Sequence, residues 1–322
     1  MKRALTAVCL LIFHAGLAPA GDPAPGTQLG PPRLDLLKDA AICPDGAGAF
    51  YLTGTAGTLD KSGRADFDYN RGAPLWRSTD LKKWECLGFA WDRVAQFARS
   101  GKPKLGVWLD WSAPADRMDG LLAHATTTPK LYRISKEWYL ICAMNGQNIL
   151  LQKSATGKAE GPYDDFAYLA TRGGHPSLFV DDAPPEGAAA PAVYLVFGDA
   201  WIARLKPDLT ALAEDIRPLL PAPGPNPAEN RLTLGDPGVA MFKRGGAYGV
   251  FAARWNVRDG KPSHDAVLWT SEQIYGPYRE TSVVLPGFGP VSVFQDAAGT
   301  WQAVSSQPFK DAPRMTAIPE AR

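Results

Sequence analysis

The sequence predicts an all-β fold: a five-bladed β-propeller with a helix and loop insertion between blades 1 and 2. Helical periodicity is scarce, and short β-rich runs broken by Gly, Pro and Asp recur along the chain. Five of these runs align on an aromatic residue: Tyr51, Tyr139, Tyr194, Tyr248 and Trp301. The intervals between these residues are 88, 55, 54 and 53. A constant interval of about 50 residues is typical of propeller blades with four strands each.

Each aromatic run follows a second apolar run, which we interpret as the strand nearest the propeller axis. These runs comprise residues 38–46, 129–135, 175–182, 237–246 and 290–299. The first strand of each blade lines the axis, so the residues that head these strands should meet in one pocket. The heads are Asp39, Pro129 and Lys130, His175, Asp236 and Pro237, and Gly289 and Pro290. The long first interval indicates an insertion at about residues 89–125, with a short helix near residues 92–99.

The amino terminus has the features of a signal peptide over residues 1–20. Lys2 and Arg3 precede a short apolar core, and Ala18-Pro19-Ala20 fits a cleavage site. Residues 21–32 form a Pro/Gly-rich leader, and residues 33–322 are expected to form a single propeller domain. The apolar core is too short to span a bilayer, and no later segment is long and apolar enough. We therefore expect a secreted or periplasmic protein.

Charge and cysteine content exclude some classes of function. The formal net charge is +1 and there is no run of Lys or Arg, so neither a nucleic acid nor an anionic membrane is an expected partner. Cys43, Cys86 and Cys142 remain after the signal peptide, and we expect buried, unpaired thiols. Neither a CxxC nor an HExxH pattern occurs, so no dedicated zinc site is expected.

Several motifs follow one another in a characteristic order. They are "LKDAAICPDGAGAFYLTGT" (37–55), "PLWRSTDLKKWECLG" (74–88), "EGPYDD" (160–165), "HPSLFVDD" (175–182) and "IYGPYRE" (274–280). Together they resemble the blade motifs of glycoside hydrolase family 43, five-bladed propellers that hydrolyse arabinose- and xylose-containing glycans. The resemblance covers the chain from about Leu34 to Ser306.

The resemblance implies an inverting hydrolase with three carboxylates. The first carboxylate activates a water molecule, and a second group, a carboxylic acid, protonates the leaving oxygen. In inverting enzymes these two carboxyl groups are about 6.5–9.5 Å apart. By resemblance these come from the first and fourth blades, and a third-blade carboxylate orients the acid. Asp39 stands at the first position as the general base. His175 replaces the third carboxylate, and it either contacts the acid or plugs the channel as a buried ring.

The fourth-blade acid falls on Pro237, which cannot transfer a proton. Asp236, one residue earlier, could replace it if the strand start is shifted or bulged, since a one-residue slip otherwise reverses the side chain. A histidine is the other candidate acid, because its ordinary pKa lies near neutral pH. The candidates are His124, His175 and His264. Asp265, beside His264, should point to the opposite side of its strand.

Two supporting positions also depart from the family. Lys130 stands where the second blade usually has Glu, and Pro290 stands where the last blade often has a His that holds a water or cation. A calcium ion on the axis, which the family analogy suggests, is therefore not favoured. We expect no cofactor and no metal.

Aromatic and polar side chains supply the expected sugar contacts. The predicted substrate-binding residues are Trp108, Trp111, His264 and Lys130. Further candidates for stacking are Trp91, Trp201 and Trp255. By contrast, Trp76 and Trp84 should pack between blades.

Three functions remain open at this point. The first is a glycoside hydrolase acting on plant- or algal-type polysaccharides or oligosaccharides, with Asp39 as base and an altered acid. The second is a catalytically inactive glycan-binding propeller derived from the same family. Both predict a carbohydrate partner of the arabinose, xylose or galactose type. The third is a structural partner of another secreted protein, since fold alone does not fix function.

Overall fold

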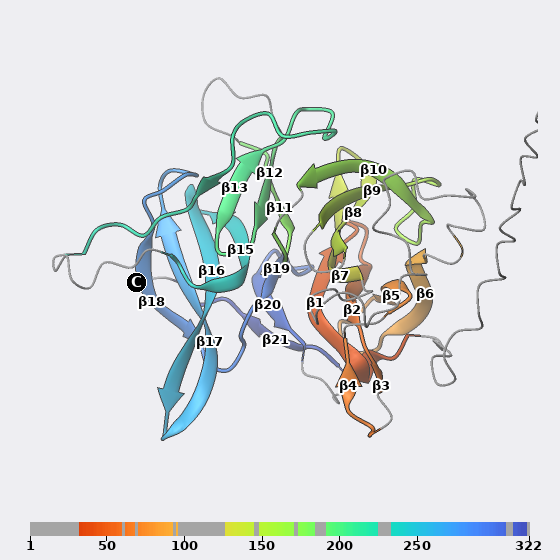
Figure 1. Cartoon of the computed structure of the whole chain (residues 1–322), viewed down its shortest axis with the longest axis horizontal. Helices are drawn as coiled ribbons and strands as arrows, with labels where there is room; N and C mark the ends of the chain where they lie inside the picture. Colours follow the sequence, from red (N-terminus) through yellow and green to blue (C-terminus); the bar gives the residue numbers. More distant parts are fainter. Residues whose placement is uncertain are drawn as a thin grey trace, which may run out of the picture.

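The computed structural model describes residues 32–59, 62–67, 70–92, 95, 126–144, 148–170, 173–183, 191–224, 233–306 and 312–320. Five sheets of three or four strands are arranged around one axis (Figure 1). The prediction of an all-β, five-bladed propeller is confirmed. The predicted signal peptide and most of the insert, including all of its expected helix except Asp92 and Ala95, lie outside the described residues. No helix in the described part of the chain is long and apolar enough to cross a membrane.

Blades 1 and 2 come from the first half of the chain. Blade 1 contains β1 (Leu37–Pro44), β2 (Phe50–Ala56), β5 (Gly72–Ser78) and β6 (Glu85–Asp92), after a short 3-10 turn, η1 (Leu34–Leu36). A small ribbon of β3 (Thr58–Leu59) and β4 (Ala65–Asp66) follows β2. Blade 2 contains β7 (Thr126–Ile134), β8 (Glu137–Met144), β9 (Asn148–Ser154) and β10 (Tyr163–Ala170).

The remaining blades follow in chain order. Blade 3 contains β11 (Ser177–Asp181), β12 (Ala192–Phe197), β13 (Trp201–Arg204) and β14 (Arg217–Pro218). Blade 4 contains β15 (Asp236–Arg244), β16 (Ala247–Arg258), β17 (Lys261–Ser271) and β18 (Arg279–Leu285). Blade 5 contains β19 (Ser292–Gln295), β20 (Trp301–Ser305) and β21 (Arg314–Ala317).

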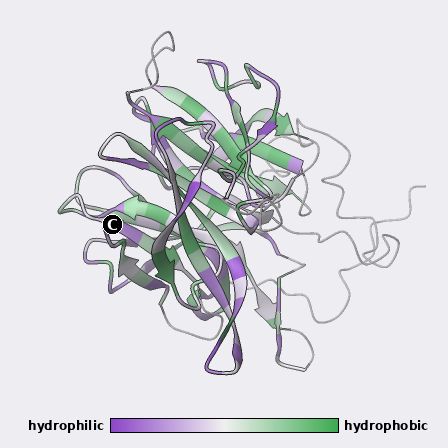
Figure 2. Ribbon diagram, turned by 90° about the vertical axis from the view of Figure 1, so that its left-hand side faces the viewer, coloured by the Kyte–Doolittle hydropathy of each residue, from purple (hydrophilic) through white to green (hydrophobic). Residues whose placement is uncertain are grey.

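The core is divided among the interfaces between neighbouring blades. Five clusters of buried apolar side chains join blades 1 and 2, 2 and 3, 3 and 4, 4 and 5, and 5 and 1. The last cluster closes the ring by packing Phe294 and Val304 against Leu52 and Trp76. Figure 2 shows the apolar residues along the strands of the blades. Since both faces of each blade are covered near the axis, strands such as β2 and β12 are continuous buried runs, whereas outermost strands such as β6 and β18 are partly exposed.

The outer edges of blades 2 and 4 repeat one local structure. Tyr163 and Tyr278 each follow a Gly-Pro pair and are completely buried. Their hydroxyls donate to the carbonyls of Ala159 and Ile274, at 2.9 and 2.7 Å. Since these bonds satisfy the polar end of a buried ring, each tyrosine contributes apolar area without an unpaired hydroxyl. The Gly-Pro-Tyr motifs are thus equivalent in structure.

The three cysteines among the described residues, Cys43, Cys86 and Cys142, are free. Cys43 and Cys142 are buried, as predicted, and burial raises the pKa of each thiol, that of Cys43 to about 12. The prediction of burial was wrong for Cys86, which is exposed on β6, the outermost strand of blade 1. An apolar neighbourhood in sequence does not distinguish an inner strand from an edge strand.

Packing between blades predicts a large difference between two leucines. Leu140 is completely buried in the interface of blades 1 and 2, whereas Leu220 is 48% exposed beyond β14. We expect Leu140→Ala to lower the free energy of unfolding by about 2–5 kcal/mol, since it leaves a cavity. Leu220→Ala should change it by less than about 0.5 kcal/mol. Urea denaturation followed by tryptophan fluorescence checks this, and equal midpoints for the two variants would contradict it.

Candidate active site

The five inner strands begin with the same backbone feature. Asp39, Thr128 and His175 have φ values of 56°, 49° and 54°, in the left-handed region that non-glycine residues seldom occupy. Gly238 and Gly289 hold the equivalent positions in blades 4 and 5, with φ values of 104° and 61°. In each case regular pairing with the next strand begins two or three residues later. The repeated turn directs all five chain segments at one mouth of the axial channel.

The structure corrects the predicted heads in two blades. In blade 2 the equivalent residue is Thr128, which precedes the predicted Pro129 and Lys130. In blade 4 it is Gly238, which follows the predicted Asp236 and Pro237. Pairing of β15 with β16 is irregular between Asp236 and Ala240, so the bulge needed to re-aim Asp236 is present.

Asp39 is held by its neighbours in blades 1 and 2. The Thr55 hydroxyl donates to Asp39 Oδ2 at 2.8 Å and accepts the Thr128 amide at 2.8 Å. Thr55 therefore orients the carboxylate and ties it to the second inner strand. No sequence signal identified Thr55, because its contact depends on the displaced pairing at Lys38 and Ala41.

His175 lies two residues before the third inner strand, close to Gly238 of the fourth blade. A Cβ atom at Gly238 would be 3.5 Å from His175 Nδ1 and 3.0 Å from Pro290 Cβ, so the absence of a side chain at Gly238 leaves room for the ring. Burial lowers the pKa of His175, and the nearby charge of Asp39 opposes this effect. The ring is thus near Asp39 but favours the neutral form, unlike the carboxylate that the family resemblance implies.

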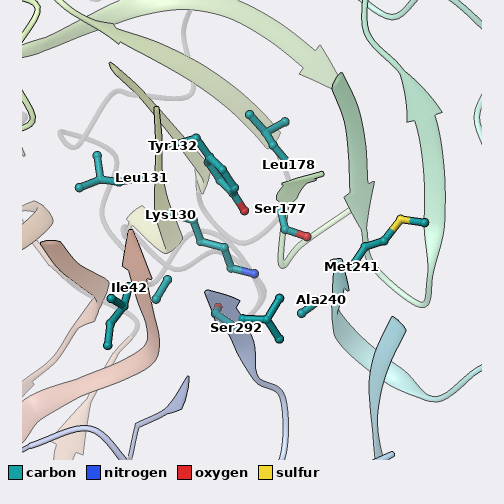
Figure 3. Close-up of a pocket in the computed structure, with 11 residues that line it drawn as sticks. Ile42, Lys130, Leu131, Tyr132, Ser177, Leu178, Ala240, Met241 and Ser292 are labelled. Carbon is teal, nitrogen blue, oxygen red and sulfur yellow. The ribbon is translucent and has the colours of Figure 1, made fainter. Parts of the chain in front are cut away.

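Lys130 reaches into the axial channel below this mouth. A cavity of about 50 Å³ is lined by the inner strands of all five blades, including Ala41, Ser177, Ala240 and Ser292. Figure 3 shows the Lys130 amine pointing into it. Burial lowers the pKa of Lys130 to about 8, and the negative charge of Asp39 acts in the opposite direction. Lys130, Asp39 and His175 therefore form one electrostatic group at the axis.

The residues around the axis do not fit a calcium ion. Calcium is held by six to eight oxygen ligands, mostly carboxylates and carbonyls. Here the channel contains the Lys130 amine instead of the expected Glu, and Pro290 offers no side-chain ligand. A cation would have to enter beside an ammonium group, which repels it.

Asp236 and His264 form a hydrogen-bonded pair on blade 4. His264 Nε2 and Asp236 Oδ2 are 2.9 Å apart, and both side chains are partly accessible. His264 also lies at the mouth, since a Cβ atom at Gly289 would be 3.2 Å from its Nδ1. Asp265 points the other way, as predicted from strand alternation, and contacts Asn256 and Arg258. The pair places a hydrogen-bonded imidazole and carboxylate beside the channel.

The predicted aromatic contacts divide into four groups. Trp108 and Trp111 lie outside the described residues, as does His124. Trp91 is buried at 1% exposure in the interface of blades 1 and 2, so the suggestion that it stacks on sugar is wrong. Trp76 and Trp84 pack between blades 1 and 5, as predicted. Trp201 and Trp255 are exposed.

The buried amine predicts an unusual pH dependence of stability. In the unfolded chain Lys130 regains its ordinary pKa of 10.5, so between about pH 8 and 10.5 the unfolded state binds the extra proton. Stability therefore rises with pH in this range, by about 3 kcal/mol in total at 1.36 kcal/mol per pKa unit. We expect Lys130→Met to be more stable than the parent at pH 7, and this advantage to shrink toward pH 10.5.

Urea denaturation of both proteins across that pH range provides the measurement. Taking the difference between them removes the contributions of cysteines and tyrosines that titrate in both. A difference that stays constant with pH would show that Lys130 is not buried as an ammonium.

Comparison with known proteins gives a distant relative and a shared fold. No protein-family model matches the chain. A curated protein of Escherichia coli K12 named "Putative beta-xylosidase" is 25% identical over 248 residues, which cover 75% of this chain. The matched part is only 40% of that protein, so the chain spans less than half the length of its relative.

Solved structures of glycoside hydrolases resemble the whole propeller. The GH43_1 enzyme of Xanthomonas citri has a TM-score of 0.61 at 16% identity, covering 91% of this chain and 90% of the enzyme. An α-L-arabinofuranosidase of Clostridium thermocellum has a TM-score of 0.59 at 13% identity, covering 88% of this chain and 93% of the enzyme. The predicted resemblance to the five-bladed propeller of glycoside hydrolase family 43 is therefore confirmed at the level of the fold.

Proposed function

We propose that this protein is an exported glycoside hydrolase of the family 43 type, acting on arabinose-, xylose- or galactose-containing poly- or oligosaccharides. The observation that carries this proposal is the position of Asp39. Its carboxylate is fixed by Thr55 at the axial mouth, on the left-handed turn that the five inner strands share. The fold similarity and the distant β-xylosidase-like relative support a carbohydrate substrate.

The proposed mechanism uses side chains of two blades. Asp39 removes a proton from a water molecule that attacks the anomeric carbon. In the state that carries one proton more than a neutral imidazole and a carboxylate, the Asp236 and His264 pair donates that proton to the leaving glycosidic oxygen. The pair is left as a neutral imidazole hydrogen-bonded to a carboxylate. His175 and Lys130 fill the places of carboxylates, so they shape the field around Asp39 instead of adding negative charge.

The same replacements favour a second candidate, a glycan-binding propeller without turnover. A neutral His175 and a buried Lys130 leave the pocket with fewer acidic groups than the family resemblance implies. A binding protein needs the shape and polar contacts of the pocket but not a matched acid and base.

Hydrolysis assays of mature protein, residues 21–322, on arabinosyl, xylosyl and galactosyl substrates separate the two candidates. We expect turnover with inversion of the anomeric configuration, and a loss of about 10²–10⁴-fold in kcat for Asp39→Asn and for His264→Gln. Asp215→Asn, an exposed aspartate of blade 3, is the matched control and should keep full activity.

Absence of turnover together with saturable binding of one of these glycans would establish the second candidate. Absence of both activities would overturn the assignment to carbohydrates.

We further propose that the protein uses neither a metal nor another cofactor. The Lys130 amine supplies positive charge inside the channel, so we expect neither calcium nor EDTA to change the melting temperature or the rate. Differential scanning calorimetry and the hydrolysis assay check this, each carried out with calcium or with chelator. A concentration of roughly 1–5 mM is enough to fill even a weak calcium site. A melting temperature that rises with calcium concentration would contradict it.

A further inference from the structure

The longest hairpin among the described residues, formed by β16 and β17, projects beyond its blade. Strands β16 and β17 pair without interruption from Tyr248 and Ser271 to Arg258 and Lys261. Pairing of β15 with β16 reaches only to Ala253, and β18 pairs with β17 no further than Ala266. Residues 254–265 therefore form a two-stranded ribbon outside the sheet, visible at the free end of β16 and β17 in Figure 1.

One face of this ribbon anchors it to the propeller. Asp265 is completely buried and accepts hydrogen bonds from Asn256, Arg258, Ser263 and the amide of Gly287. Burial raises the pKa of Asp265, but these hydrogen bonds outweigh it and lower the pKa to about 2. The carboxylate therefore stays ionised and fastens both strands to the loop before blade 5.

The opposite face carries an aromatic pair. Trp255 and His264 are cross-strand partners, and their rings stack with centroids 4.4 Å apart and planes within 5°. The edge of the His264 ring is held by Asp236 through Nε2, and the backbone carbonyl of His264 accepts the Gly289 amide at 2.8 Å. Trp255 is nevertheless 64% exposed. One ring face is covered by His264, and the rest of the indole is open to solvent.

This exposed tryptophan has the properties of a sugar-stacking platform. Its orientation is set in advance, so a ligand does not bear the entropy cost of ordering it. On this face of the ribbon the apolar neighbours of Trp255 are only Val257 and Pro262. The apolar surface of these three side chains is far smaller than the area of about 800 Å² that a protein partner covers. A flat apolar surface of one indole, next to the polar Asp236 and His264 pair, instead suits the C–H face of a sugar ring.

We propose that Trp255 forms a second sugar subsite beside the axial mouth, so that the ligand is an oligosaccharide and not a single sugar. The inference rests on the proposed function, since it places this subsite next to the Asp236 and His264 pair that donates the proton. His264 then has two roles. The face of its ring supports the Trp255 indole, and its Nε2 atom contacts Asp236.

Calorimetric titration with xylo- and arabino-oligosaccharides of one to six units tests the proposal. The full mature chain carries Asp39→Asn as the parent, so that no ligand is consumed. We expect affinity to rise with ligand length, and Trp255→Ala to weaken the longest ligand about tenfold while leaving the single sugar unchanged. Trp255→Phe should restore most of the loss, and Leu220→Ala, an exposed residue away from the ribbon, should match the parent.

The outcomes separate the subsite from the function. Equal affinities of Trp255→Ala and the parent for every length would overturn the subsite, while leaving glycan binding intact. A parent that binds none of the ligands, together with a wild type that hydrolyses none, would overturn the proposed function and the subsite with it. Circular dichroism confirms that each variant is folded, and Trp255→Phe provides the test if Trp255→Ala is not.

Discussion

Closure of the ring is the constraint on which the rest of this structure depends. No blade has a core of its own, because each sheet buries its two faces against the sheets on either side. The contact of blade 5 with blade 1 therefore buries the one face that each of these two blades would otherwise expose. Phe294 and Val304 make this contact with side chains of β1, β2 and β5. The amide of Ala40 also donates to Ser306 Oγ at 3.4 Å, beside the axis. The position of Asp39 relative to the other inner strands follows from this closure.

The architecture was predictable from the sequence because it is written in a repeated, local pattern. Buried aromatic runs at nearly equal intervals report the second strand of each blade, and the preceding apolar runs report the inner strand. Errors occurred where a residue's environment depends on partners distant in sequence. The exposure of Cys86 and the burial of Trp91 depend on which neighbouring elements cover β6, and nothing within that strand encodes it.

The site was predictable in part for the same reason. Counting from the blade motifs placed Asp39, Lys130 and His175 at the axis, where the charge of Asp39 acts on both other groups. In blades 2 and 4 the predicted strand heads were wrong by one residue, because a β-bulge shifts the strand pairing without changing the sequence motif. The support of Asp39 by Thr55, and the placement of Trp255 on a projecting ribbon, arise from pairing across strands and have no signature in a single sequence.

The left-handed turn at the head of each inner strand limits what the axis can become. This backbone region accepts glycine freely and tolerates Asp, Asn and His far better than other side chains. Asp39, His175, Gly238 and Gly289 all belong to this small set, and Thr128 is the one exception. Exchange of an acid for an imidazole or for an empty position is therefore inexpensive at these points, whereas glutamate, lysine or arginine would strain the turn. The backbone thus limits the residue types that can stand at the head of each inner strand, whatever the substrate. Substitutions among Asp, Asn, His and Gly at these positions change the chemistry of the pocket and leave the blades unaltered.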